Sequence, residues 1–249
     1  QGFKGGLSVL LQPFGGSAMD FAPAAPAPKK ISLSKVTLEK RGDKVSLEKN
    51  NAQGFGRILV NLNWSQAPIP LHDPKKQGFF NKLLGGAPAS STIDLDLGCM
   101  FEMADGKTGC VQALGNSWGQ FNDVPFIQLD GDDRSGTNSN GENIFINGDA
   151  FTAIKRILIF TFIYDGVPNW SATNGVVTIK APNQATVEVK LDNGTDASMC
   201  AIAMIENNAG NLHITKLVEY FREQGNKSTH ELMNDRFGFG LRFKAGSKD

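Results

Sequence analysis

The residues best suited to chemistry are the carboxylates and amides gathered in "LDGDDRSGTNSNGENIFI", residues 129–146. Calcium binds about six to eight oxygen atoms, which come from carboxylates, Asn side chains, backbone carbonyls and water. The stretch offers such oxygens, and its glycines allow the backbone to fold around an ion. Its acidic side chains are Asp130, Asp132, Asp133 and Glu142. The stretch is therefore either a well-solvated turn or one wall of a calcium site.

A second group of carboxylates lies in "STIDLDLG", residues 91–98. The period of a β-strand places Asp94 and Asp96 on one face, about 6.5–7 Å apart along the strand, with the apolar residues on the other face. Partly buried carboxylates this close raise each other's pKa, and a divalent cation between them removes that cost. Asp165 closes the apolar strand at 156–166 and is a third source of carboxylate. The sequence leaves open whether it lies beside the other two.

Other kinds of metal site fit these stretches less well. Neither stretch contains a sulfur or imidazole ligand, which disfavours zinc and copper. The spacing of the acidic residues also departs from that of an EF-hand loop, so a helix–loop–helix site is rejected. The pattern predicts an oxygen-only site for calcium.

Composition narrows the class of protein. Among 249 residues, 25 Lys and Arg balance 25 Asp and Glu, so no overall charge attracts nucleic acid and no nucleic-acid function is expected. The cysteines form no CxxC pair and are odd in number, which argues against a disulfide framework and favours a cytoplasmic setting. No apolar run reaches the roughly 18 residues of a membrane-spanning helix. The chain begins with Gln1 rather than Met, as a piece of a longer protein would.

Enzyme signatures are absent from the sequence. No nucleophile motif lies near a histidine, and no glycine-rich phosphate-binding loop is present. Cys99 and Cys200 lie in apolar segments, where a thiol acts as a small buried hydrophobe. The histidines are His72, His213 and His230. We therefore expect a protein without enzymatic activity.

The chain divides into a tail and one folded domain. Residues 1–30 form a Gly-, Pro- and Ala-rich tail, and the domain spans 31–249. Two alternating segments around Gly42 and Asp43 predict a β-hairpin. An insertion at 65–91 interrupts the domain, and its short apolar face at helical spacing would dock on a partner or a membrane, or cap the protein's own core. That face consists of Phe79, Phe80, Leu83 and Leu84.

Strand-like alternation dominates the rest of the domain. The expected strands are residues 56–64, 91–103, 156–166, 174–182, 185–192, 199–207, 212–221 and 237–246. Asn, Gly, Asp and Pro separate them, and only residues 149–156 suggest one or two helical turns. Many short strands with turn residues between them predict an all-β protein, a two-sheet antiparallel β-sandwich with little helix.

Several motifs in order resemble the TerD-like tellurium-resistance family. They are "VSLEK", "IDLDLGCMFE", "GDDRSG", "GENIFIN", "RILIFTFIYDG" and "FGFGLRF". The segments "QALGNSWGQFNDVPFIQLDGDDRSG", "YDGVPNWSATNGVVTIKAP" and "LVEYF" look closer to the TerA branch. The resemblance covers about residues 31–246, apart from the insertion.

This resemblance implies a calcium-binding β-sandwich without enzymatic activity. It implies a cytoplasmic stress-response role with other tellurium-resistance and stress proteins, in assemblies that include homo-oligomers and can associate peripherally with the membrane. The metal ligands it implies, together with those expected above, are Asp94, Asp96, Asp132, Asp133, Glu142, Asn143 and Asp165. One departure is "TNSNGEN", residues 137–143, whose only acid is Glu142 where family members often carry several. Fewer charges weaken calcium binding, so one firm site is expected rather than two.

Two other functions stay open at this point. A structural or assembly protein would use the insertion at 65–91 and the N-terminal tail to form oligomers, and its acidic loop would only be solvated. A tellurite-transforming enzyme would use the thiols of Cys99, Cys110 and Cys200.

Overall fold

The computed structural model describes eight ranges of the chain, which together contain the folded domain. They are residues 35–49, 54–65, 69–70, 90–91, 93–131, 141–165, 170–191 and 196–244. The expected tail, the apolar face of the insertion, and Asp132 and Asp133 lie outside these ranges. Within the described ranges, no helix has the length and apolar character that a membrane span requires.

Two large β-sheets form the domain, which confirms the predicted all-β sandwich. In spatial order, the seven-stranded sheet contains β1 (Val36–Leu38), β13 (Val187–Lys190), β12 (Val176–Lys180), β3 (Arg57–Asn63), β10 (Glu142–Asn147), β9 (Ile127–Leu129) and β8 (Gly119–Gln120). The six-stranded sheet contains β2 (Lys44–Leu47), β15 (Asn211–Phe221), β14 (Met199–Asn208), β11 (Ile154–Asp165), β6 (Asp94–Met103) and β7 (Thr108–Val111). All described pairs in both sheets are antiparallel except β1 with β13.

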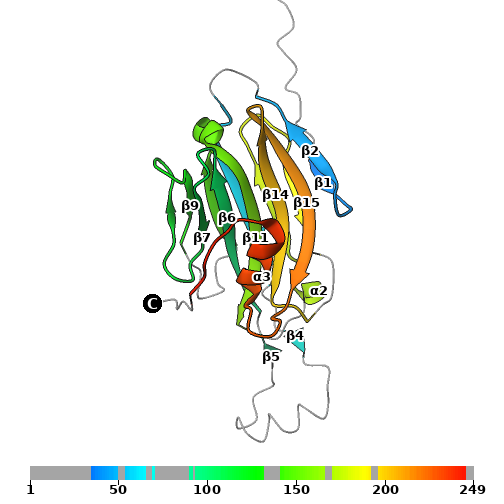
Figure 1. The fold of residues 1–249 in the computed structure, drawn as a ribbon. Coiled ribbons are helices and arrows are strands. Elements are labelled where there is room, and N and C mark those ends of the chain that lie inside the picture. Colours follow the sequence, from blue (N-terminus) through cyan, green and yellow to red (C-terminus); the bar gives the residue numbers. More distant parts are fainter. Residues whose placement is uncertain are drawn as a thin grey trace, which may run out of the picture. The chain divides into compact units, whose positions relative to one another are not determined.

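Short elements complete the described part of the chain. These are β4 (Ile69–Pro70), which pairs with β5 (Ser90–Ser91), the 3-10 helix η1 (Gly148–Ala153), α2 (Trp170–Thr173) and α3 (Thr229–Phe237). The 3-10 helix agrees with the helical turns expected near residues 149–156. Figure 1 shows α3, in red, lying across strands of the six-stranded sheet.

The main core lies between the two sheets. Alternate residues of β3, among them Ile58 and Leu62, face alternate residues of β6, such as Leu95 and Leu97, and all four are fully buried. A second apolar cluster covers the other face of the six-stranded sheet, where α3 packs on residues such as Met100. Residues 95–101 of β6 are buried on both faces, so a polar side chain in this part of the strand is withdrawn from water.

The prediction of a β-hairpin around Gly42 and Asp43 is wrong. The tight turn exists, because Asp43 N donates to Lys40 O at 3.0 Å. However, β1 joins the seven-stranded sheet beside β13, and β2 joins the six-stranded sheet beside β15. The turn therefore carries the chain from one sheet to the other, and both strands find their partners far along the sequence.

The prediction of a strand at 237–246 is also wrong. Residues 229–237 form α3, and the segment that follows it is irregular. Gly238 and Gly240 have φ values of 65° and 70°, in the left-handed region, which an extended strand does not use. At the other end of α3, Ser228 and Glu231 form a reciprocal capping box. The sequence "STHE" carried that signal for a helix start.

His230, near the start of α3, makes the stability of the fold sensitive to acid. Burial lowers the pKa of His230 to about 4, whereas an exposed histidine has a pKa of about 6.5. The unfolded chain therefore binds the proton first, and stability that is complete above pH 6.5 is lost as the pH falls towards 4. We expect this group to lower the free energy of unfolding by about 2–3 kcal/mol across that window.

Urea denaturation at several pH values measures this effect. A His230→Gln variant provides the reference, because it retains every other acid-sensitive group. The wild-type profile should fall more steeply than that of the variant between pH 6.5 and 4. Parallel profiles would show that His230 does not titrate in this way.

Candidate metal centre

Two of the predicted ligand residues lie in register where β6 begins and β11 ends. Asp94 lies directly opposite Asp165 in the antiparallel pairing of these strands. A bulge between Ile163 and Asp165 adjusts the register immediately before this pair. The structure thus places the backbone of Asp165 beside that of Asp94, which the sequence left open.

Asp96 is one strand repeat further along β6, on the same face as Asp94 by alternation. Its side chain is only 1% exposed. It pairs in register with Phe162 of β11, whose ring belongs to the apolar cluster under α3. A carboxylate in such surroundings is costly unless hydrogen bonds or a cation compensate for its lost hydration.

Glu142, the first residue of β10, is 4% exposed and crosses to the opposite sheet. Its Oε2 accepts a hydrogen bond from the backbone N–H of Leu97, in β6, at 2.5 Å. The strand β7 pairs with β6 only from Cys99 to Glu102, so the ladder on that side has ended before Leu97. The Glu142 carboxylate therefore accepts the N–H of Leu97 beyond the end of β7. This hydrogen bond connects the start of β10 to β6.

Alternation along β10 explains why Glu142 is buried. It shares a face with Ile144 and Ile146, both fully buried in the main core. The segment "GENIFIN" already carried this signal, because strand period places the glutamate on the apolar face. The inward direction of Glu142 and its bond to β6 were not among the sequence-based predictions.

Asn143 lies on the other face of β10. Its Oδ1 accepts a hydrogen bond from Asn61 Nδ2, on the neighbouring strand β3, at 2.9 Å. The same Nδ2 group lies 3.4 Å from the backbone oxygen of Glu142. These contacts place the Asn143 side chain on the outer face of the seven-stranded sheet, away from β6.

The predicted ligands in the described ranges thus divide into three groups, and Asn143, on the outer face of the seven-stranded sheet, forms one of them by itself. Asp94, Asp96 and Asp165 lie at one end of the β6–β11 pair, and Glu142 reaches β6 from the other sheet. Among the described residues, no three His, Cys, Asp or Glu side chains are positioned to hold a metal ion. The loop at 132–140, which includes two predicted ligands, lies outside those residues and connects directly to β10.

The donor chemistry at this end of the sandwich fits calcium. Every predicted ligand offers oxygen, which hard cations prefer. A carboxylate has about four acceptor positions, so the bond from Leu97 does not exhaust the capacity of Glu142. Asp96 and Glu142, both buried, are the acidic residues at this end that lie farthest from water among the described ligands.

The three cysteines have the properties of structural thiols. Cys99 and Cys200 are fully buried, and no disulfide links the three. Burial raises the pKa of the Cys99 thiol well above its usual value, and neighbouring Cys110 raises it further. Burial also raises the pKa of Cys110 to about 12. The thiolate, which is the reactive form, is therefore scarce at neutral pH for these two residues.

The fold and this end of the molecule define a class: two-sheet β-sandwich proteins in which acidic segments from both sheets meet at one end. The chain is 42% identical over 256 residues to "Tellurium resistance protein TerA" of Alcaligenes sp., and the match spans 100% of this chain and 70% of that protein. The chain belongs to the TerA branch of the TerD-like tellurium-resistance family. No protein-family model matches it.

Two solved structures are among those similar to this chain. One is a protein of unknown function, with a TM-score of 0.49 and 14% identity over 76% of this chain and 99% of that one. The other is a homologue of the telluride-resistance protein TerD from Streptomyces coelicolor A3(2), with a TM-score of 0.44 and 18% identity over 69% of this chain and 93% of that one.

Proposed function

We propose that this tellurium-resistance protein binds calcium without enzymatic activity and acts as a scaffold or sensor in the cellular stress response. The observation that carries this proposal is the meeting of Asp94 and Asp165 in register beside the buried Asp96. Acidic residues at one end of two strands offer the oxygen ligands and the negative charge that calcium prefers. Family membership supports the biological setting.

The ligands in this proposal come from two parts of the chain. Asp94, Asp96 and Asp165 serve as the strand ligands, and the loop that contains Asp132 and Asp133 supplies the others. Bound calcium would supply positive charge that neutralises these carboxylates and joins the loop to the strands.

Glu142 determines where the loop meets the strands. Its bond to Leu97 holds the first residue of β10 against β6. Residues 132–140 precede Gly141 and β10 in the chain, and in this proposal they bring their ligands to this end of the sandwich. Glu142 thus positions the loop, and its second oxygen contributes to the metal site in this proposal.

A sensor role follows in this proposal because calcium would link β6, in one sheet, to the segment before β10, in the other sheet. A ligand that binds only the folded state stabilises that state, and here it would order the loop against the end of β6. The ordered end would then present a surface to partner proteins. We propose other tellurium-resistance and stress proteins, or further copies of this chain, as those partners, in a cytoplasmic assembly that can approach the membrane.

Thermal unfolding with and without calcium tests the choice of ligands. After treatment with a chelator, wild-type protein should gain several degrees in Tm when free calcium reaches about 100 times Kd, since such binding contributes about 2.7 kcal/mol. Asp94→Asn should lose most of this gain, because a carboxylate ligand is removed. Glu206→Gln should keep this gain in Tm. Glu206 is exposed and lies in β14 opposite Arg156, near the start of β11 and away from Asp165. If calcium raised the Tm of both variants equally, Asp94 would not be a calcium ligand.

The properties of the thiols support a non-enzymatic role, and replacing them tests it. A variant with alanine at Cys99, Cys110 and Cys200 should retain the tellurite resistance of the wild type in cells, once its expression level is matched. Each buried replacement is expected to lower the free energy of unfolding by about 1 kcal/mol because it leaves a small cavity. Loss of resistance in the folded variant would instead favour the tellurite-transforming enzyme.

A further inference from the structure

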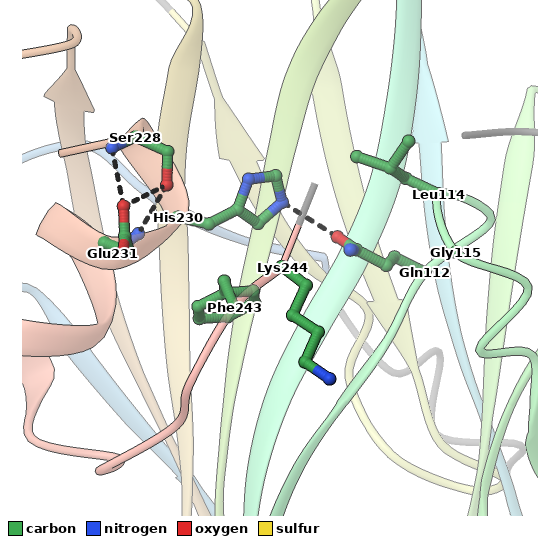
Figure 2. Close-up of a pocket in the computed structure, with 8 residues that line it drawn as sticks. All are labelled: Gln112, Leu114, Gly115, Ser228, His230, Glu231, Phe243 and Lys244. Carbon is green, nitrogen blue, oxygen red and sulfur yellow. Dashed lines mark hydrogen bonds between the residues drawn. The ribbon is translucent and has the colours of Figure 1, made fainter. Parts of the chain in front are cut away.

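A cavity of about 380 Å³ lies on the outer side of the six-stranded sheet, far from the acidic segments in sequence. Figure 2 shows side chains from three segments around it: the end of β7 and its turn, the start of α3, and the segment after α3. The residues that matter for recognition are Gln112, Leu114, His230, Glu231, Phe243 and Lys244. Its size lies within the range of about 300–1,000 Å³ that is usual for small-molecule sites.

Gln112 presents hydrogen-bond donors to this cavity. Its side chain is 7% exposed, and its Oε1 accepts a hydrogen bond from His230 Nε2 at 2.9 Å. This bond directs the Gln112 amide group, because the oxygen faces the histidine and the NH2 group faces away from it (Figure 2). In the described part of the chain, the NH2 group has no hydrogen-bond partner. This NH2 group offers two hydrogen-bond donors to a ligand that accepts hydrogen bonds.

The charges at the cavity favour a ligand with a single negative charge. Lys244 supplies an ammonium group, which forms no ion pair with the described residues. Glu231 supplies a carboxylate, whose pKa is lowered by the backbone N–H and then the hydroxyl of Ser228. Burial keeps His230 neutral at pH 7. Among the described residues that line the cavity, Lys244 supplies the cation that can pair with one carboxylate, whereas the second charge of a dianion would have no such partner and Glu231 would oppose it.

Phe243 and Leu114 supply the apolar part of the lining. The ring of Phe243 lies 5.3 Å from the ring of His230, centroid to centroid, and Leu114 lines the cavity together with it. These groups offer contact area to a hydrocarbon or aromatic body but no further hydrogen bonds. A purely inorganic anion would leave this area unused.

We propose that this cavity is a binding site for a small monocarboxylate with an apolar body. The carboxylate accepts hydrogen bonds from the Gln112 amide and the Lys244 ammonium, and the apolar body packs on Phe243 and Leu114. The site is separate from the proposed calcium site and does not depend on it.

Phenylacetate, added to the full chain in buffer that contains a calcium chelator, is the probe for this proposal. Amide-detected NMR should show saturable shifts of the Gln112 side-chain NH2 signals and of backbone signals around Leu114 and Phe243. We expect millimolar affinity for a ligand of this size. Phenylacetamide, which is neutral, and phenylphosphonate, which carries more negative charge, should each bind at least about fivefold more weakly.

Lys244→Met is the decisive variant, because this exposed side chain has no structural partner among the described residues. It should weaken phenylacetate binding by at least about fivefold and leave Tm unchanged. Lys180→Met, which removes an exposed lysine from the other sheet, should bind as the wild type does. Shifts confined to other parts of the protein, or equal affinity of the Lys244→Met variant and the wild type, would overturn the proposal. Failure of calcium binding would leave these results unaffected.

Discussion

A Glu142→Ala substitution is expected to lower the free energy of unfolding by about 2–4 kcal/mol. The buried N–H of Leu97 would lose its acceptor, which lies at 2.5 Å in the folded protein. An orphaned buried donor costs about 1–3 kcal/mol, and the space left by the side chain adds a cavity term. Urea denaturation followed by circular dichroism, in the presence of a chelator, measures the change.

Glu142→Gln is the matched comparison for this experiment. Its amide oxygen can still accept the hydrogen bond from Leu97, so the metal-free stability should stay within about 1.5 kcal/mol of the wild type. Its neutral side chain should nevertheless reduce stabilisation by calcium, because one negative ligand is lost. If Glu142→Ala changed stability by less than about 0.5 kcal/mol, Glu142 would not be the fastening between β10 and β6.

A Trp170→Ala substitution should have the largest effect on stability, about 3–5 kcal/mol. Trp170 begins α2 and is fully buried in the main core. Its indole N–H donates to the backbone oxygen of Ala197 at 2.7 Å, and its ring lies 5.5 Å from that of Tyr220. The residue therefore joins the chain after β11 to the chain before β14, near the end that carries Asp165.

Trp170→Phe separates the two contributions of this side chain. It retains an aromatic ring in the core but leaves the Ala197 oxygen without its donor, so a smaller loss of about 1–3 kcal/mol is expected. Denaturant melts of both variants measure the difference. Equal losses would show that the hydrogen bond, rather than the burial of the ring, accounts for the effect.

Strand alternation was sufficient to predict most of the sandwich. Segments such as β6 and β11 have long apolar faces, and the period of two identifies both the strand and its buried side. Alternation does not specify the partner of a strand. The segments on either side of Gly42 fit a local hairpin equally well, but each is stabilised by a distant strand in a different sheet.

The error after α3 has a different physical origin. Residues 237–246 alternate apolar and small residues as a strand does, yet Gly238 and Gly240 adopt left-handed backbone angles. Glycine adopts these angles at little cost, and its presence alone does not reveal which conformation the tertiary structure selects. The Ser228–Glu231 capping box was the more informative signal.

The candidate site was only partly predictable from the sequence. Spacing placed Asp94 and Asp96 on one face of a strand, but pairing Asp94 with Asp165 requires the register of two strands that are distant in sequence. The alternation of "GENIFIN" could have indicated an inward Glu142, although no prediction used it, whereas its bond to Leu97 depends on where β7 ends. Such contacts between sheets follow from topology rather than from local pattern.

Calorimetric titration of calcium into chelator-treated wild-type protein tests the central claim most directly. We predict saturable binding of about one ion per chain, together with a rise in Tm at the same calcium concentrations. This stoichiometry follows the sequence-based prediction of one firm site, because Glu142 is the only acid in residues 137–143. The absence of both binding heat and thermal stabilisation at millimolar calcium would contradict the proposed function.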